Sequence, residues 1–357
     1  MNNKQIHVVH IIPTLTFGGA ERFVVDLVNN LPPSFRSTII VLRDVKPLAV
    51  ELKHGVDVHY VEKRGEISFG LFGDLKKKLT ELRPDVVHTH LFGGDFWGRV
   101  AAHRLGIPVV TTEHNVNLDE SFPKRLIKKK IANWSDAYTA PSDAVRQFMQ
   151  KTYRITREIT MIHHGIDIGR FASAAPYAPR SPVRLFMLGR ITPQKGHDVA
   201  LAALKELKNA DWTLDIIGEG VEKETIQKKI RDYQLDRRVH LLPPTLDVPE
   251  IMALHDIMLM PSRWEGLGIA AMEAMAAGRV VIASRVGGLP EVITHEKNGF
   301  LVPPEDPQAL ALRITYCFEH PDHCKEIAAQ ARKDARRFDV KNMVREYEQV
   351  YRALAKR

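Results

Sequence analysis

The sequence predicts an α/β protein built from two doubly wound parallel sheets in tandem. Three observations lead to this fold class. The chain has 357 residues, more than one hydrophobic core usually supports. Short apolar, β-branched runs alternate with amphipathic stretches, which is typical of a parallel sheet with crossover helices. The alternation stops near residue 175 and then starts again.

Each half contains six expected strands, and the amphipathic stretches between them are expected to be helices. The strands of the first half fall at 6–12, 37–42, 56–61, 85–90, 108–114 and 137–142, and those of the second at 183–190, 212–220, 238–244, 256–262, 279–284 and 299–304. We therefore expect two Rossmann-like domains.

We expect a linker between these halves, because residues 170–182 are rich in Ala, Pro and Ser and show neither the helical nor the strand period of apolar residues. We place the first domain at 1–174 and the second at 175–337. The last segment, 338–357, has apolar residues at helical spacing, so it should form an amphipathic helix that packs back on the first domain.

The composition is that of an ordinary globular protein, with 44% hydrophobic and 26% charged residues. Two cysteines, Cys317 and Cys324, give no disulfide framework or thiolate metal site. No run of eighteen apolar residues and no cleavage-site pattern occurs, so a cytoplasmic location is expected. The net charge is +8, and residues 1–180 hold the excess, with 25 Lys and Arg against 18 Asp and Glu. This charge alone does not choose between nucleic acid, anionic lipid and phosphate-rich substrates.

Residues that follow the strands are the candidates for function, since ligands of such sheets bind beyond the carboxyl ends of the strands, here in an expected cleft between the two sheets. The stretch PSRWEGLGIAAMEAMAAG at 261–278 follows a strand and opens a helix, whose first N–H groups can bind an anion. Glu265 precedes this helix and Glu273 lies within it.

A carboxylate repels a bare pyrophosphate but accepts hydrogen bonds from sugar hydroxyls. If the helix starts near Leu267, the two carboxylates lie about 10 Å or more apart. Two hydroxyl-bearing groups that flank a phosphate, as in a nucleotide-sugar, fit this layout. The alternative is that Glu265 is a solvated turn residue and Glu273 an ion-paired helix residue.

With seven residues between them, Glu265 and Glu273 resemble the E-x7-E element of the retaining glycosyltransferases of family 4, which have the GT-B fold. Six other landmarks of that family occur in the same order along almost the whole chain: FGGAER at 17–22, DVVHTH at 85–90, TTEHN at 111–115, HHGID at 163–167, GRITPQKG at 189–196 and GGLPEV at 287–292.

The resemblance implies that the second domain binds a nucleotide-sugar, with a UDP-sugar favoured. Glu273 would accept from the ribose hydroxyls and Glu265 would contact the donor sugar. Arg190 and Lys195 would bind the diphosphate, and this assignment also has a physical basis, because two cations stabilise the charge of a departing nucleoside diphosphate. The remaining donor-binding residues are expected to be Gly218, Gly266, Leu267, Gly268 and Ile269.

In the first domain, the resemblance puts Gly18 and Gly19 close to the diphosphate and His114 beside the donor sugar and the acceptor. The catalytic residues would then be His114, Glu265, Arg190 and Lys195. A tight turn at the glycines and a structural role for His114 are the alternatives.

No metal or other cofactor is expected. The chain has no D-x-D element, and the pairs His88/His90 and His163/His164 lack a carboxylate or thiol at a suitable spacing. Two departures from the family pattern stand out: Pro243 and Pro244 remove N–H donors from a loop that often lies beside the nucleobase, and Leu267 replaces the more usual phenylalanine.

The implied reaction is transfer of a hexosyl or N-acetylhexosaminyl unit, with retention, to a hydroxyl of a glycan or lipid-linked acceptor. Such acceptors belong to cell-surface polysaccharide or glycolipid synthesis. A GT-B-fold nucleotide-sugar epimerase and a non-catalytic nucleotide-sugar-binding protein are the alternatives. A nicotinamide-dependent oxidoreductase is disfavoured, because neither domain has a strong glycine fingerprint after its first strand.

The segment 124–134 groups five basic residues around apolar ones, in the manner of a helix that rests on anionic lipid. A solvated basic face on a helix that packs its apolar side inward is the alternative. We expect a nucleotide-sugar donor and a glycan or lipid-linked acceptor as partners, with possible contact to an anionic membrane surface and none to nucleic acid.

Overall fold

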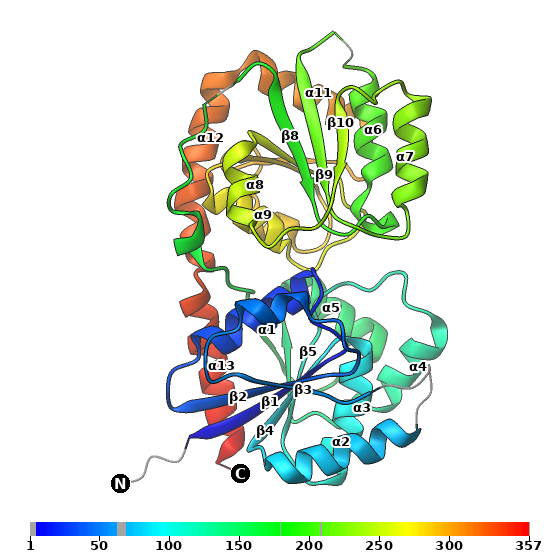
Figure 1. Cartoon of the computed structure of the whole chain (residues 1–357), viewed down its shortest axis with the longest axis vertical. Helices are drawn as coiled ribbons and strands as arrows, with labels where there is room; N and C mark the ends of the chain where they lie inside the picture. Colours follow the sequence, from blue (N-terminus) through cyan, green and yellow to red (C-terminus); the bar gives the residue numbers. More distant parts are fainter. Residues whose placement is uncertain (1–4, 63–68, 179, 208, 357) are drawn as a thin grey trace. The chain divides into compact units, whose positions relative to one another are not determined.

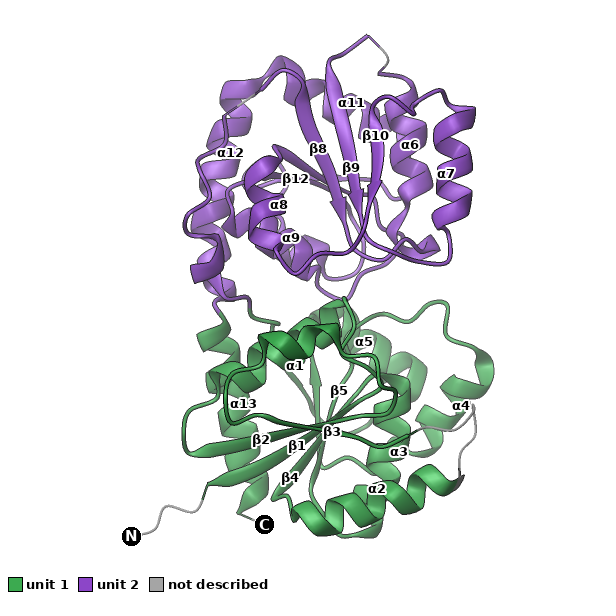
Figure 2. Cartoon of the chain, viewed as in Figure 1, with its two compact units in different colours: residues 1–165, 340–357 green, residues 166–339 purple. Residues whose placement is uncertain are grey.

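The chain folds into two compact units (Figure 2). The computed structural model describes residues 5–62, 69–178, 180–207 and 209–356. Unit 1 consists of residues 1–165 and 340–357, and unit 2 of residues 166–339. The division lies at 165 rather than near 175, because Ile166 and Phe171 are part of the buried core of unit 2.

Unit 1 contains a parallel sheet of seven strands in the order β3-β2-β1-β4-β5-β6-β7 (Figure 1). The strands are β1 (Ile6–Ile12), β2 (Phe35–Val41), β3 (Asp57–Tyr60), β4 (Val86–His90), β5 (Val109–Thr112), β6 (Ala137–Ala140) and β7 (Ile159–Met161). The helices are α1 (Gly19–Asn30), η1 (Pro47–Glu51), α2 (Phe69–Leu82), α3 (Leu91–Arg104), α4 (Phe122–Lys130), α5 (Asp143–Phe148), η2 (Met149–Tyr153) and α13 (Val340–Ala355).

Helix α13 returns from the end of the chain to unit 1, where it contacts α1, β1 and β4. Its residues Tyr347 and Tyr351 are fully buried. Their hydroxyl groups bond to side chains of the sheet: Tyr351 to His88 Nδ1 at 2.7 Å, and Tyr347 to Thr112 and Thr139 at 3.1 and 3.0 Å. The last helix is therefore an integral layer of unit 1.

Unit 2 contains a parallel sheet of six strands in the order β10-β9-β8-β11-β12-β13. The strands are β8 (Val183–Leu188), β9 (Trp212–Ile217), β10 (Val239–Leu242), β11 (Ile257–Met260), β12 (Val280–Ser284) and β13 (Phe300–Val302). The helices are η3 (Ile168–Phe171), η4 (Pro193–Lys195), α6 (His197–Lys205), α7 (Lys223–Asp232), α8 (Val248–Leu254), α9 (Ile269–Ala276), α10 (Leu289–Val292), α11 (Pro307–Glu319), α12 (Pro321–Asp334) and η5 (Ala335–Phe338).

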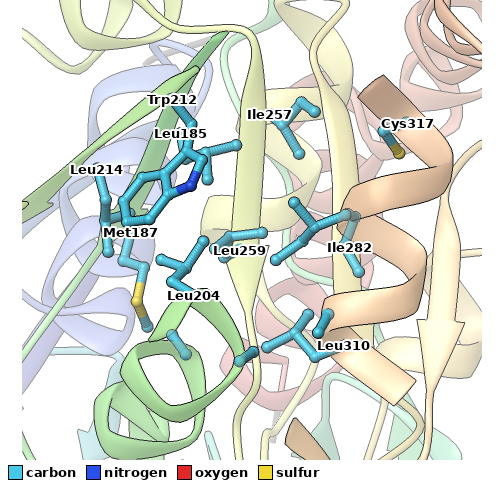
Figure 3. Close-up of a cluster of buried hydrophobic side chains, with 14 of the residues drawn as sticks. Leu185, Met187, Leu204, Trp212, Leu214, Ile257, Leu259, Ile282, Leu310 and Cys317 are labelled. Carbon is cyan, nitrogen blue, oxygen red and sulfur yellow. The ribbon is translucent and has the colours of Figure 1, made fainter. Parts of the chain in front are cut away.

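The core of unit 2 lies on both faces of its sheet, because alternate residues of a strand point to opposite sides. On one face, Leu185 and Leu259 pack with Leu204 of α6 and with Leu310 of α11 (Figure 3). On the other face, their strand neighbours pack with the apolar residues of α8, α9 and η3. Both faces are covered, which explains why the strand segments read as continuous apolar runs.

Each sheet changes direction of strand order once, between β1 and β4 in unit 1 and between β8 and β11 in unit 2. The loops that leave the carboxyl ends of strands at such a switch point diverge, and ligands of open α/β sheets bind there. Within the described residues, no helix has the length and apolar character needed to cross a membrane.

Candidate functional site

The candidate site of unit 2 is formed by the loops after β8 and β11, at the switch point of the sheet. The first loop, 189–196, carries Arg190 and Lys195, and the second, 261–268, carries Glu265. The structure thus brings together segments that are 70 residues apart in sequence. A hydrogen bond from Gln194 Nε2 to the carbonyl of Trp264, at 3.0 Å, joins the two loops.

Glycines let the backbones of these loops approach one another closely. A Cβ on Gly196 would lie 2.0 Å from the Pro261 carbonyl oxygen. One on Gly287, in the loop after β12, would lie 1.8 Å from the Glu265 carbonyl oxygen. Gly218 follows β9, and a Cβ on it would lie 2.0 Å from the Gly189 carbonyl oxygen. Gly218, one of the expected donor-binding residues, thus has a packing role: it brings the β9 loop against the β8 loop.

Lys195 and Glu265 form an ion pair. Glu265 is buried and also accepts a hydrogen bond from Ser262 Oγ at 3.0 Å. Arg190 is exposed, and its guanidinium bonds to Gln194 Oε1 at 3.4 Å. An ammonium, a guanidinium and a carboxylate therefore lie on two adjoining loops.

Helix α9 begins at Ile269, two residues later than the sequence suggested. Gly268, its N-cap, has a φ of +94°, a left-handed conformation that a glycine adopts without steric cost. The first N–H groups of a helix have no partner within the helix, so this end can receive an anion. Glu273 lies about one turn into α9 and is buried.

Arg263 was not singled out from the sequence, yet its side chain connects the loop after β11 to the loop after β8 and to α6. Its guanidinium donates two hydrogen bonds to Asp198 of α6, at 2.9 and 3.1 Å, and one to Glu305 at 3.0 Å. Its NH1 group also bonds to the Pro193 carbonyl oxygen at 2.7 Å. Only its position two residues before Glu265 could have drawn attention to Arg263, and that signal is weak.

In unit 1, Gly18 is the N-cap of α1 and Gly19 its first residue. The carboxylate of Glu21 occupies the space above Gly18, where a Cβ would lie 2.3 Å from Glu21 Oε2. Glu21 is buried and accepts a hydrogen bond from Thr16 Oγ1 at 3.0 Å. The absence of a side chain at Gly18 therefore makes room for this carboxylate.

His114 lies two residues beyond β5, in a row of buried histidines. Both of its ring nitrogens have histidine partners: Nε2 is 3.1 Å from His90 Nδ1, and Nδ1 is 3.2 Å from His164 Nε2. Burial, with a smaller contribution from Lys128, lowers the pKa of His114 to about 3, so its ring is neutral.

The sequence showed the pair His88 and His90, and the structure places His10 beside it. His10, His88 and His90 each offer a nitrogen atom within 4.8 Å of the others, and all three are buried. His10 comes from β1 and the other two from β4, so no sequence spacing indicates the group. The ring nitrogens of His88 are bonded to the hydroxyl groups of Tyr351 and Thr112, at 2.7 and 2.6 Å.

The prediction that all five basic residues of segment 124–134 lie on one surface is wrong for Lys128. Lys128 does not belong to a basic surface, because it is buried beneath α4. Its ammonium lies 2.6 Å from Glu113 and 3.2 Å from Glu120, and it bonds to Tyr153 OH at 3.1 Å. Although burial alone lowers the pKa of Lys128, these acidic partners raise it above its usual value. Ile131 is also buried, whereas Phe122 and Leu126 are exposed.

Two family models match the chain, and together they cover most of it. "Glycosyltransferase Family 4" matches residues 17–170, and "Glycosyl transferases group 1" matches residues 173–334. The glycogen synthase of Mycobacterium tuberculosis is 29% identical over 266 residues, which are 70% of this chain and 64% of that protein. The match therefore spans slightly less than two thirds of that relative's length.

Another relative is the UDP-Gal:alpha-D-GlcNAc-diphosphoundecaprenol alpha-1,3-galactosyltransferase of Escherichia coli, 25% identical over 84% of each chain. Among solved structures, Anabaena HepE in complex with UDP and glucose has a TM-score of 0.85 at 21% identity, with 97% of this chain and 99% of HepE covered. This likeness establishes the fold. The chain therefore belongs to the glycosyltransferases of family 4 and has the GT-B fold.

Proposed function

We propose that the protein is a retaining glycosyltransferase that uses a nucleotide-sugar, with a UDP-sugar favoured. It transfers a hexosyl or N-acetylhexosaminyl unit to a hydroxyl of a glycan or lipid-linked acceptor, in the synthesis of a cell-surface polysaccharide or glycolipid. Two of its relatives support this choice, one named for a UDP-sugar and a lipid diphosphate, and one solved with UDP and glucose.

The observation that carries the proposal is the pairing of Lys195 with Glu265 beside the open end of α9. Lys195, Arg190 and the first N–H groups of α9 are suited to a diphosphate, since all of them favour negative charge. Glu265 is suited to a sugar hydroxyl and Glu273 to the ribose, because carboxylates accept hydrogen bonds. The two cations supply the charge that a metal ion provides elsewhere, so we propose metal-independent transfer.

In the proposed reaction, the bond from the anomeric carbon to the diphosphate oxygen breaks as the acceptor oxygen forms its bond on the same face of the sugar. The acceptor proton passes to the departing phosphate oxygen. Fixed positive charge stabilises this leaving group, and such preorganised charge is often the largest single contribution to catalysis. In unit 1, we propose that Gly18, Gly19 and His114 contribute to the binding of donor and acceptor.

A thermal-shift screen with UDP-, GDP- and ADP-sugars tests the donor. A ligand that binds only the folded protein stabilises it by about 2.7 kcal/mol at one hundred times its dissociation constant. We expect the largest shift with a UDP-sugar, followed by transfer to a glycan or lipid-linked acceptor. Equal shifts with all three donors, or none, would contradict the proposed donor.

Variants of the ion pair test the site. We expect Lys195→Met to lower kcat/KM by about 10²- to 10³-fold, because it removes a charge that faces the leaving group. Lys78→Met is a matched control, since Lys78 forms a lysine–glutamate pair with Glu81 on the surface of α2. Unchanged transfer by Lys195→Met would exclude the assigned role.

Two alternatives have distinct products. An epimerase converts the nucleotide-sugar when no acceptor is present, and a binding protein is stabilised by the donor but neither converts nor transfers it. Product analysis with and without an acceptor distinguishes both from a transferase.

We also propose a cytoplasmic protein that rests peripherally on an anionic membrane through the outer face of α4. The side chains of Leu118, Phe122 and Leu126 are 55%, 77% and 41% exposed. Phe122 and Leu126 are four positions apart on α4, so they lie on one face, and Leu118 lies in the turn before this helix. The exposed Lys124, Lys129 and Lys130 lie on the same helix. Apolar groups beside lysines are the pattern of an interfacial helix.

Sedimentation with phosphatidylglycerol liposomes tests this surface. We expect Phe122→Ser and Lys129→Glu each to weaken binding. Phe122→Ser removes apolar area that would enter the membrane, and Lys129→Glu reverses a charge near the lipid headgroups. Lys228→Glu on α7 carries the same charge change and is expected to bind as the unaltered protein does. Absence of binding at low salt would end this proposal.

A further inference from the structure

Four histidines of unit 1 form a continuous hydrogen-bonded chain across the carboxyl ends of the strands. His10 belongs to β1 and His90 ends β4, whereas His114 and His164 follow β5 and β7. The chain runs from His10 Nδ1 to His90 Nε2 at 3.2 Å, from His90 Nδ1 to His114 Nε2 at 3.1 Å, and from His114 Nδ1 to His164 Nε2 at 3.2 Å. Each contact joins the Nδ1 of one ring to the Nε2 of the next.

All four rings are neutral. They are buried, and burial lowers the pKa of His10 and His114 to about 3 and that of His90 and His164 well below the usual value. A neutral imidazole has one N–H donor and one acceptor nitrogen. Each contact therefore needs one hydrogen, supplied by one of its two rings.

This requirement leaves the chain only two arrangements. If His10 carries its hydrogen on Nδ1, it donates to His90 Nε2, so His90 must carry its own hydrogen on Nδ1, and the same follows for His114 and His164. In the opposite arrangement, all four rings carry hydrogen on Nε2. The tautomer of each ring is fixed by that of its neighbour.

The end of the chain at His10 selects between the two. His10 Nε2 is buried and has no hydrogen-bond partner among the residues that the structure describes. With hydrogen on Nε2, it would be a buried N–H donor without an acceptor, a rarer and costlier state than a lone pair without a donor. The arrangement with hydrogen on Nδ1 throughout is therefore favoured.

We propose that this chain fixes His114 as the Nδ1–H tautomer, so that His114 acts on a sugar hydroxyl as a hydrogen-bond donor and not as a base. Its Nε2 lone pair is occupied by His90 Nδ1–H, whereas its Nδ1–H can be shared between His164 Nε2 and a hydroxyl oxygen. His90 is then a positioning residue, which acts through His114. This part of the inference rests on the proposed function, and the tautomers of the chain do not.

Nitrogen-15 NMR of the full chain, labelled at histidine, tests the tautomers directly. We expect His10, His90, His114 and His164 to show a protonated Nδ1 and an unprotonated Nε2, with single-histidine variants to assign the signals. A protonated Nε2 on His114 would overturn the proposal. So would a metal ion retained by His10, His88 and His90 and detected by elemental analysis, because both nitrogens of His90 belong to the chain and a nitrogen that binds a metal ion cannot also form a hydrogen bond.

Two variants of His90 test the positioning role. His90→Leu removes the donor to His114 Nε2, so neither the tautomer nor the orientation of His114 is fixed from that side, and we expect kcat/KM to fall about tenfold or more. The amide of His90→Asn can donate from nearly the position of Nδ1, so it should keep the tautomer of His114 and stay within about threefold of the unaltered enzyme. UDP binding, measured by thermal shift, should be equal in both variants.

The outcomes separate the two parts of the inference. Full activity of His90→Leu would overturn the positioning role, even if the tautomers were as expected. If the unaltered protein transferred no sugar from any donor, the proposed function would fall, while the NMR result on the unaltered chain would still decide the tautomers. That result uses variants only to assign the histidine signals.

Discussion

At the scale of single residues, the site of unit 2 depends on positions that lack a side chain. Gly287 has a φ of +52°, and its Cα lies so close to the Glu265 carbonyl that a Cβ has no room. The backbone of Glu265 thereby packs against Gly287, and its carboxylate is bound by Lys195 and Ser262. The packing of these glycines is thus a condition for the geometry of the charged residues.

We expect Gly287→Ala to lower the free energy of unfolding by about 2 kcal/mol or more, because the substitution adds left-handed strain of about 1–2 kcal/mol to a backbone clash. Gly73→Ala is the matched control: Gly73 lies inside α2 with nothing within 4 Å of its would-be Cβ, so alanine should stabilise the protein by about 0.5–1 kcal/mol. Urea unfolding of both variants gives the comparison, and equal free energies would contradict the role of Gly287.

Residue type predicted only part of this chemistry. A lysine, an arginine and two glutamates after parallel strands indicated an anionic, hydroxyl-rich ligand, and the structure unites Lys195 with Glu265. The histidine chain could not be predicted, because its members come from separate strands and the bonds depend on strand order. The burial of Lys128 was missed for a related reason: its partners, Glu113 and Glu120, precede α4 and fold beneath it.

At the scale of elements, Arg263 fastens α6 to the loop after β11 through Asp198. Burial alone raises the pKa of Asp198, but the hydrogen bonds and charge of Arg263 lower it below its usual value of 3.8. A carboxyl group whose pKa is lower in the folded state adds stability above its unfolded pKa, and this stability is lost as the pH falls through the folded pKa.

We therefore expect Asp198→Asn to reduce the free energy of unfolding by about 0.5–1 kcal/mol at pH 7, since the pair is partly exposed. The difference from the unaltered protein should shrink as the pH falls below about 4, where Asp198 itself becomes protonated. Urea unfolding at pH 7, 5 and 3 measures it, with the exposed Asp232→Asn as control. A difference that grows in acid would have the wrong sign for this pair.

The strands and helices were predicted well where the pattern of apolar residues determines them. They were predicted less well where the backbone conformation of single residues determines their ends. The run at 6–12 is β1 and the run at 85–90 contains β4, because β-branched apolar residues favour buried parallel strands. The start of α9 was expected near Leu267 but falls at Ile269, because Gly268 is left-handed. The linker seen at 170–182 overlaps η3, whose Phe171 is buried in unit 2.

At the scale of the whole molecule, the two units differ in how the chain builds them. Unit 2 is one continuous segment, whereas unit 1 needs α13 from the end of the chain. Gly165 lies against Val340, since a Cβ on Gly165 would be 2.5 Å from Val340 Cα. The two segments of unit 1 therefore adjoin at this point.

We expect residues 166–339, expressed alone, to unfold cooperatively in urea. Residues 1–165 alone should not, because the surface of β1 and β4 that packs against Tyr347 and Tyr351 would be exposed. A short linker from residue 165 to residue 340, with 166–339 omitted, should restore cooperative unfolding. Cooperative unfolding of 1–165 by itself would contradict the assignment of α13 to unit 1.

The return of α13 also sets an order for biosynthesis. A ribosome completes the segment that forms unit 2 before it has made α13, so the part of the protein translated first is the last to finish folding. A message that is cut short, or a nascent chain that is released early, leaves an apolar sheet face open to chaperones and proteases. The folding of unit 1 thus waits for a helix that is made after the whole of unit 2.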